Sequence, residues 1–127
     1  IVILYKFSKL EVDTLRSLAL NLPFVTEDFP FDEVTLVFRI GNKIFAILPL
    51  DAGEPSVSLK CDPEWAEELR TTFTAITPGY HLNKKHWNSV LLNQGLEREM
   101  IIKMLEHSYT LVLQSLPKKL KATFTAI

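Results

Sequence analysis

The residues best equipped for chemistry lie in one stretch, residues 78–88, which reads PGYHLNKKHWN. It holds two of the three histidines, one of the two tryptophans and two adjacent lysines. Proline fixes φ and glycine tolerates positive φ, so Pro78-Gly79 predicts a turn. The next residues, 89–92, have the pattern of a short strand. The sequence therefore predicts a polar loop presented by a sheet, which is where binding groups commonly lie.

This loop combines positive charge with aromatic rings, the combination that binds nucleic acids. Lysines contact phosphates, and aromatic rings stack on unpaired bases. Arg39 and the basic segment 118–121 would extend the same surface if they lie on the same side. The candidate residues for binding a nucleic acid or another ligand are Lys60, Tyr80, His81, Asn83, Lys84, Lys85, His86, Trp87 and Asn88.

Two other interpretations fit the same loop. In the first, Tyr80–Trp87 lines a cleft for an acidic small ligand or a protein partner, with the lysines as anchors. In the second, the loop is structural: Trp87 packs in the core, Asn83 and Asn88 cap the turn, and the lysines only solvate it. A deep apolar pocket beside His81 would favour the first interpretation, whereas a convex basic ridge would favour DNA.

Neither metal binding nor catalysis has a recognisable pattern. His81 and His86 lie five positions apart with no cysteine or carboxylate beside them, whereas zinc sites need three or four ligands. Cys61 precedes a predicted helix, which favours a thiolate, but adjacent Asp62 opposes ionisation. We expect an unreactive, half-buried thiol. The four glycines form neither a phosphate loop nor a nucleophile elbow. We therefore expect no metal, no cofactor and no enzymatic activity.

The composition is that of one globular domain. Of 127 residues, 47% are hydrophobic and 23% are charged, enough apolar material for a core. The 14 Lys and Arg against 15 Asp and Glu give a net charge of −1. This balance argues against a dedicated nucleic-acid binder and permits only weak, salt-dependent binding by a local patch. One cysteine excludes an internal disulfide and fits the cytoplasm.

No membrane segment is expected. The apolar run Ile1–Tyr5 is far shorter than the about 20 residues that cross a bilayer. Since the chain does not begin with Met, we expect residues 1–6 to be either an added segment or a flexible leader.

The first elements are a helix and an edge strand. Ser8 and Glu11 have capping-box spacing, and apolar residues then recur at helical spacing up to Pro23. In the acidic segment 26–33, alternation predicts that Phe29 and Phe31 face the core, while a proline between them confines the segment to a sheet edge.

The strongest local pattern is a hairpin. Residues 35–40 and 43–48 flank Gly41-Asn42, which predicts a two-residue turn of type II′. This register pairs Phe38 with Phe45, Leu36 with Ile47, and Ile40 with Lys43. Alternation then places Leu36, Phe38, Ile40, Phe45 and Ile47 on the core face, and leaves a mixed opposite face.

The rest predicts a strand at 56–60, a helix capped by Asp62, and a long helix over 96–116. On the helix after Asp62, Trp65, Leu69 and Phe73 are expected to face the core and Arg70 to face water. Residues 120–127 form a tail. The pentapeptide TFTAI occurs at 72–76 and again at 123–127, too short for an architectural repeat.

Several stretches together resemble the MmcQ/YjbR family of small bacterial proteins. In chain order they are residues 25–31, 35–38, 57–63, 77–88, 107–109 and 116–119. The resemblance implies a frataxin-like fold of the double-wing DNA-binding type, without a settled activity. Where the family usually has glycine after Pro23, this chain has Phe24. Smaller departures are Leu82 for Met, Ser89 for Thr and Ser58 for Asn.

We therefore expect residues 1–127 to form a single α+β domain. An antiparallel sheet would carry an N-terminal helix and a long C-terminal helix on it. The expected function is weak DNA binding by a non-enzymatic, cytoplasmic bacterial domain through its basic and aromatic loop. The alternative is a small-ligand or protein-interaction module.

Overall fold

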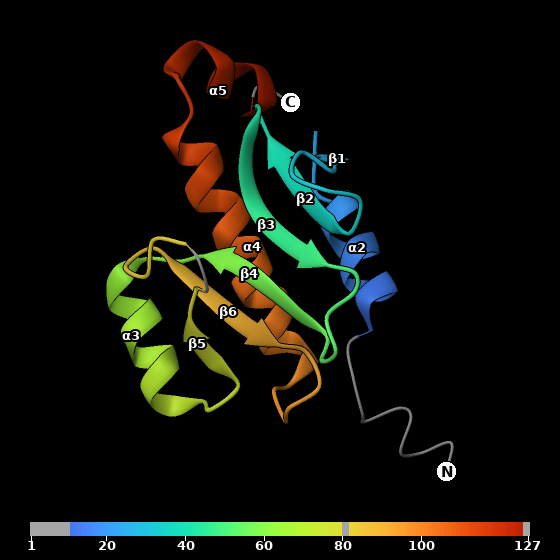
Figure 1. Ribbon diagram of the computed structural model, residues 1–127. Coiled ribbons are helices and arrows are strands. Elements are labelled where there is room, and N and C mark those ends of the chain that lie inside the picture. Colours follow the sequence, from blue (N-terminus) through green and yellow to red (C-terminus); the bar gives the residue numbers. More distant parts are fainter. Residues whose placement is uncertain (1–10, 80–81, 126–127) are drawn as a thin grey trace.

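The computed structural model describes residues 11–79 and 82–125. The elements are α2 (Val12–Leu20), β1 (Thr26–Asp28), β2 (Thr35–Ile40), β3 (Lys43–Pro49), β4 (Ser56–Lys60), α3 (Pro63–Thr72), β5 (Ile76–Pro78), β6 (Trp87–Leu91), α4 (Arg98–Ser115) and α5 (Lys118–Thr125). The strands form one antiparallel sheet in the order β1-β2-β3-β4-β6-β5. Figure 1 shows the long helix α4 crossing behind this sheet. The predicted α+β class and antiparallel sheet are confirmed.

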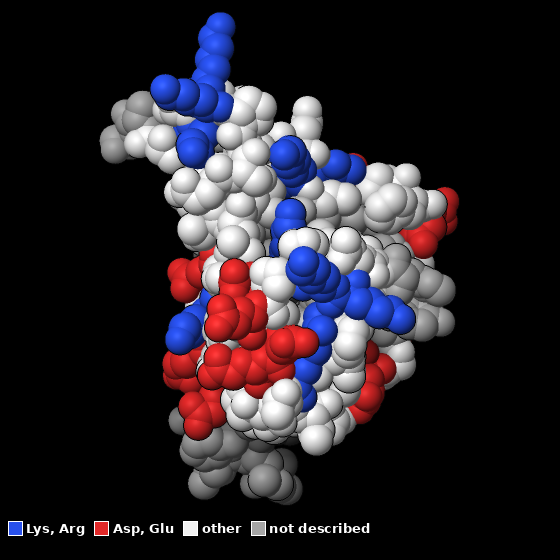
Figure 2. Space-filling model, turned by 90° about the vertical axis from the view of Figure 1, so that its left-hand side faces the viewer, with Lys and Arg blue, Asp and Glu red and all other residues white. Residues whose placement is uncertain are grey.

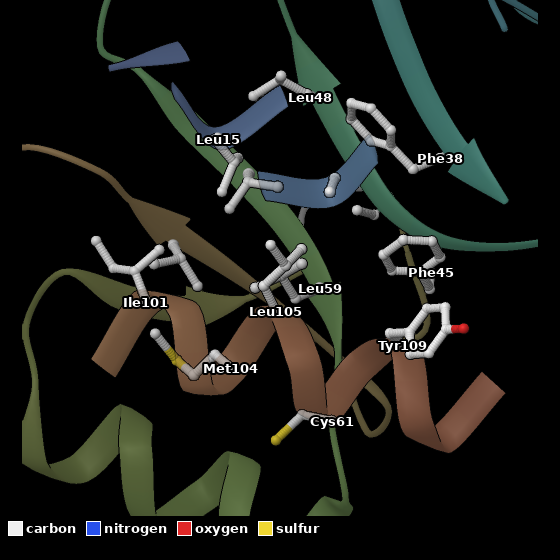
Figure 3. Packing of buried hydrophobic residues seen from close by; sticks show 14 of the residues in the cluster. Leu15, Phe38, Phe45, Leu48, Leu59, Cys61, Ile101, Met104, Leu105 and Tyr109 are labelled. Atoms are coloured by element: carbon white, nitrogen blue, oxygen red, sulfur yellow. The ribbon is translucent and has the colours of Figure 1, made fainter. Parts of the chain in front are cut away.

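The core lies between one face of the sheet and the helices. On α4, the buried residues Ile101, Met104, Leu105 and Ser108 recur at helical spacing, so they form one inward stripe. Figure 3 shows Leu105 beside the strand residue Leu59, with side chains of α2 close to the same cluster. Helix α3 joins this layer through Trp65, whose ring meets His107 of α4 edge-on at 4.6 Å.

The opposite face of the sheet carries Val37, Ile47, Ser58, Ser89 and Thr77 in one row across five strands. Because side chains alternate along a strand, Lys60 and Trp87 also lie on this face, two positions along from the serines.

The β2–β3 hairpin differs from its predicted geometry. Gly41 and Asn42 both have positive φ, 57° and 70°, which is a type I′ turn and not type II′. The pairing of Ile40 with Lys43 is confirmed, but Phe38 pairs with Ala46 and not with Phe45. A register shift between Phe38 and Arg39 causes the difference.

The consequence of this bulge is a shift of the core face. Phe45 is fully buried and packs edge-on against Tyr109 of α4, with ring centroids 5.5 Å apart. Beyond it Leu36 pairs with Leu48, which is buried, while Ile47 is displaced to the other face and is only half-buried. The predicted core position of Ile47 is therefore wrong.

The segment after β1 also departs from prediction. The strand ends at Asp28, and Phe29 and Phe31 are 46% and 66% exposed, so neither faces the core. The physical reason is a local turn. Pairing with β2 stops at Asp28, and the Asp32 carboxylate accepts hydrogen bonds from the Val34 N–H (2.9 Å) and the Thr35 N–H (2.6 Å), so residues 29–34 form a loop that turns back into β2.

Two helix starts test the capping predictions. In α3, the Asp62 carboxylate accepts from the Trp65 N–H at 3.2 Å and Pro63 occupies the first turn, as predicted. In α2, the N-cap is Glu11, without a side-chain cap bond. The predicted cap at Ser8 lies outside the described residues.

The tail forms a further helix, α5. Its residues Leu120 and Phe124 pack near the hairpin turn, where a Cβ on Gly41 would come within 3.1 Å of Leu120. The two copies of TFTAI thus adopt different structures: residues 72–76 end α3 and enter β5, whereas 123–125 are helical. Tertiary context decides the conformation of so short a segment.

Phe24 occupies the position where the family resemblance predicts glycine. Its φ is +64°, in the left-handed region, which costs a non-glycine residue about 1–2 kcal/mol. Its ring packs against Phe124 of α5, with centroids 5.0 Å apart. The aromatic contact offsets at least part of the backbone cost.

Candidate nucleic-acid interface

The polar loop between β5 and β6 is a compact turn. The Asn83 carbonyl accepts from the N–H groups of His86 (3.2 Å) and Trp87 (3.0 Å), and its side chain accepts from the Lys85 N–H (2.9 Å). Asn83 therefore caps the turn, as the structural interpretation expects. The exposed side chains of Lys84 and Lys85 project from it. Tyr80 and His81 lie outside the described residues.

Gly79 allows the two strands at this loop to approach closely. Its N–H donates to the Trp87 carbonyl at 2.8 Å, and an added Cβ would stand only 2.8 Å from the Trp87 Cβ. A larger residue would force β5 and β6 apart at this point.

Arg70 of α3 anchors the loop from outside. Its Nε donates to the Asn88 side-chain oxygen at 2.6 Å, and its guanidinium also donates to the carbonyls of Lys84 and Trp87. The prediction that Arg70 faces water is therefore wrong, because the side chain is half-buried against the loop. A signal was present: Arg70 follows buried Ala66 by four positions, so the two share a helix face.

Trp87 and Asn88 lie on opposite faces of β6. Asn88 is 2% exposed and points into the core side, and its amide nitrogen has no hydrogen-bond partner within residues 11–79 and 82–125. Trp87 is half-buried on the other face, directly across from Lys60. Trp87 is therefore not a core anchor, and it lies where a ring and a lysine can act together.

His86 fixes the loop to β4. Its carbonyl accepts from the Cys61 N–H at 2.8 Å, and the next N–H, of Asp62, donates to His107 Nε2 at 3.1 Å. Burial lowers the pKa of His107, the effect of Asp62 being smaller and opposite. A neutral imidazole, which this backbone donor requires, is thus favoured.

The thiol of Cys61 is unsuited to catalysis. It is 4% exposed, and burial, reinforced by Asp62, raises its pKa to about 11. The thiol is therefore protonated at neutral pH. In the described part of the chain, no three His, Cys, Asp or Glu residues gather in a group that could hold a metal ion.

Positive charge is concentrated at one end of the sheet, which we call the basic end. It comprises the β2–β3 turn, the end of β4, the loop 82–86 and α5, which the strand pairing and the contacts of Gly41 bring together. Figure 2 shows Lys and Arg side chains running down from α5, with Asp and Glu side chains on both sides of this row and most densely at the left, at the level of α3. The basic end carries Arg39, Lys43, Lys60, Lys84, Lys85, Lys118, Lys119 and Lys121.

The other end of the sheet, which we call the acidic end, consists of the loops 29–34, 50–55 and 92–97. These loops carry no lysine or arginine. Their acidic residues are Asp32, Glu33, Asp51, Glu54 and Glu97. A net charge of −1 therefore conceals a strong separation of charge along the strands.

A cleft of about 510 Å³ lies between α3 and the polar loop. Lys84, Lys85 and Arg70 line one part, and Glu64 and Glu67 of α3 line another. Trp87 is not one of the described residues that line this cleft. The cleft carries charges of both signs, whereas the ligand interpretation calls for a deep apolar pocket beside His81, a residue outside the described ranges.

The fold and the loop can now be compared with known proteins. The YjbR family model matches residues 20–111. YbdF of Escherichia coli O157:H7, described as an uncharacterized protein, is 37% identical over 107 residues, which cover 84% of this chain and 88% of YbdF. This chain belongs to the YjbR family. The family predicted from the sequence motifs is confirmed.

Other members agree. YjbR of Escherichia coli K12, also described as uncharacterized, is 35% identical over 81 residues, covering 64% of this chain and 69% of that protein. The crystal structure of Deinococcus radiodurans DR2400, a DUF419 domain, superposes with a TM-score of 0.84 at 40% identity, covering 89% of this chain and 86% of that one. A crystal structure from Pseudomonas syringae gives 0.71 at 28% identity, covering 81% and 99%.

No helix in the described ranges is long and apolar enough to cross a membrane.

Proposed function

We propose that this YjbR-family domain binds DNA weakly and without enzymatic activity, through the phosphate backbone, at its basic end. One observation carries the proposal: the basic end gathers eight of the 14 lysines and arginines, whereas the acidic-end loops contain none. A local cluster of lysines and arginines can bind phosphates even when the domain as a whole has no positive net charge.

The lysines available for phosphates can be identified from their surroundings. Arg39 is engaged with Asp28 at 2.9 Å, and Lys43 Nζ lies 3.4 Å from the Ser115 carbonyl. By contrast, five lysines make no ion pair or side-chain hydrogen bond with any described residue: Lys60, Lys84, Lys85, Lys118 and Lys119. Binding these to phosphate breaks no existing interaction.

Trp87 adds a contact of a different kind. It lies across from Lys60 on the sheet face away from α4, so one phosphate and one neighbouring unpaired base could be held together. The proposal therefore favours single-stranded over double-stranded DNA in this part of the basic end.

The family resemblance supports the same surface. In the frataxin-like, double-wing arrangement that it implies, hairpins contact DNA as wings. The β2–β3 turn and the β5–β6 loop both belong to the basic end. Action in the cytoplasm belongs to the same proposal, and the free, buried Cys61 agrees with a reducing compartment.

Affinity is expected to be modest. Glu64 and Glu67 lie beside Lys84 and Lys85, and they repel phosphates. We expect a Kd on the order of 1–100 μM near physiological salt, the range of non-specific binding.

Fluorescence anisotropy with single- and double-stranded oligonucleotides at two salt concentrations tests the proposal. In the Lys84→Ala/Lys85→Ala variant, affinity should fall about tenfold, and the salt slope should become shallower by about 1–2. Lys60→Ala should weaken binding, whereas the charge-matched Arg98→Ala, at the start of α4, should not. No binding at low salt, or equal effects of Lys60→Ala and Arg98→Ala, would overturn it.

A second candidate rests on the cleft beside α3. With Arg70, Lys84 and Lys85 on its wall, it could take a small acidic ligand or an acidic protein segment. In that case the Lys84→Ala/Lys85→Ala variant would lose binding of the acidic ligand, whereas Lys60→Ala would bind the ligand like the unaltered protein. The salt dependence of DNA binding would not change in the Lys84→Ala/Lys85→Ala variant.

A further inference from the structure

The acidic end presents a patch of large apolar side chains that are exposed to solvent. Phe29, Phe31, Val34 and Leu50 are between 37% and 66% exposed. They belong to two loops joined by a hydrogen bond from the Leu50 N–H to the Val34 carbonyl at 2.7 Å. Contiguous exposed apolar side chains commonly mark interaction surfaces.

This patch is held in place by local bonds. Asp32, between Phe31 and Val34, accepts hydrogen bonds from two backbone N–H groups and from the Thr35 hydroxyl (2.9 Å). The bond from Val34 is the main cause that lowers the pKa of Asp32, so the carboxylate stays ionised at neutral pH. A fixed loop presents Phe31 to a partner with little loss of backbone entropy.

Its charge limits the partners that it can accept. Asp32, Glu33 and Asp51 lie in the same two loops, so two such patches facing each other would bring like charges together. A partner surface must instead combine apolar side chains with positive charge.

The basic end of the same protein offers such a surface. A groove of about 530 Å³ lies between α5 and the start of β1, lined by Phe24, Val25, Leu120 and Phe124 and by the turn 41–42. Phe24 is 46% exposed there. Lys118, Lys119 and Lys121 belong to the helix that forms one wall. The groove thus matches the patch in both apolar character and charge.

We propose that the acidic-end patch of one copy docks, through Phe31, into the apolar groove beside α5 of a second copy. The contact is heterologous, because each copy uses a different surface. Repeated contacts therefore give a ring or an open chain, and association should weaken as salt rises. This association needs no DNA, so its test is separate from that of the proposed function.

Sedimentation velocity of the full chain without DNA, from about 10 μM to 1 mM and at two salt concentrations, tests the contact. The unaltered protein should form concentration-dependent oligomers that dissociate at high salt. Phe31→Ser breaks the patch, and Lys118→Glu/Lys119→Glu reverses the charge beside the groove. Each variant alone should be monomeric, with an unchanged circular dichroism spectrum because these side chains are exposed.

Mixing the two variants makes the test decisive. The double-charge variant keeps an intact patch and Phe31→Ser keeps an intact groove, so together they should form a 1:1 heterodimer and nothing larger. A monomeric unaltered protein over the whole range, or no heterodimer in the mixture, would overturn the proposal. A Leu4→Glu variant tests whether residues 1–10, and not the patch, occupy the groove. If Leu4→Glu lost association while Phe31→Ser still associated, the proposal would also be overturned.

Discussion

At each end of the sheet one charged side chain holds a loop in place by hydrogen bonds, but the two side chains reach over different distances. At the basic end Arg70 reaches from α3 to three oxygens on residues 14 to 18 positions away, and it is half-buried. At the acidic end Asp32 binds donors only two and three positions away and is exposed. Arg70 therefore joins elements that are distant in the chain, whereas Asp32 shapes only its own loop. The basic end should therefore be coupled to the stability of the whole domain, and the acidic end should not.

The largest expected effect is at Arg70. Arg70→Ala leaves the buried oxygen of Asn88 without its donor and frees the polar loop. We expect the free energy of unfolding to fall by about 2–4 kcal/mol, since hydrogen bonds to charged groups contribute about 1.5–3 kcal/mol each. Urea denaturation checks this. The exposed Arg98→Ala is the matched control and should change stability by less than about 0.5 kcal/mol. Equal losses in the two variants would contradict the anchoring role.

The buried thiol gives a pH dependence at the basic end. The pKa of Cys61 is raised to about 11 from an ordinary value of 9.0, so the folded state holds its proton more tightly than the unfolded state. This contribution is fully present below pH 9 and is lost as pH rises toward 11, by up to about 2–3 kcal/mol.

Urea midpoints at pH 8 and pH 10.5 measure that loss. Cys61→Ala should reduce the difference between the two midpoints. An identical pH dependence in the variant would show that other groups, not this thiol, cause the loss.

A smaller effect is expected at the acidic end. Asp32→Ala removes a local turn whose donors remain open to water, so the unfolding free energy should fall by only about 1 kcal/mol. Asp32→Asn, which keeps an acceptor oxygen, should recover most of it. If Asp32→Ala lowered the unfolding free energy as much as Arg70→Ala does, the proposed contrast between the two ends would be contradicted.

The smallest effect concerns Phe24. Phe24→Gly relieves the left-handed backbone but removes the contact with Phe124, two changes of about 1 kcal/mol in opposite directions. The net change should lie within about 1 kcal/mol. Phe24→Ala keeps the strain and loses the ring, so it should be less stable than Phe24→Gly in the same denaturation experiment. The reverse order would mean that the backbone strain is negligible.

The contrast between the ends also explains what sequence reasoning could reach. Local signals were predicted well in position: the Asp62 cap, the two-residue turn at Gly41-Asn42 and the register at Ile40–Lys43 all depend on neighbours in the chain, although the turn is of type I′ and not of the predicted type II′. The predicted register failed at Phe38 and Leu36, because a bulge that buries Phe45 against α4 depends on a helix about 60 residues later. Only the tertiary contact selects it.

How the candidate residues lie relative to one another could be predicted only in part, for the same reason. The composition of the polar loop identified Lys84, Lys85 and Trp87, and the structure places them at one end of the sheet with Lys60. Nothing local distinguished Arg70 from the glutamates of its helix except its spacing from Ala66. Phe29 and Phe31 were assigned to the core by alternation alone, and their exposure became visible only once the strand was seen to end at Asp28.

The central claim is that the two ends of the sheet differ in function. The most direct measurement is a ¹⁵N–¹H correlation spectrum of the Phe31→Ser variant, which the account expects to be monomeric, during titration with a short single-stranded oligonucleotide at low salt. The account predicts that amide shifts cluster at the basic end, in residues 41–43, 60–61, 82–87 and 118–121, and reverse as salt is added. The loops 29–34 and 50–55 should not move. Shifts centred on those acidic-end loops, or no shifts at all, would contradict the account.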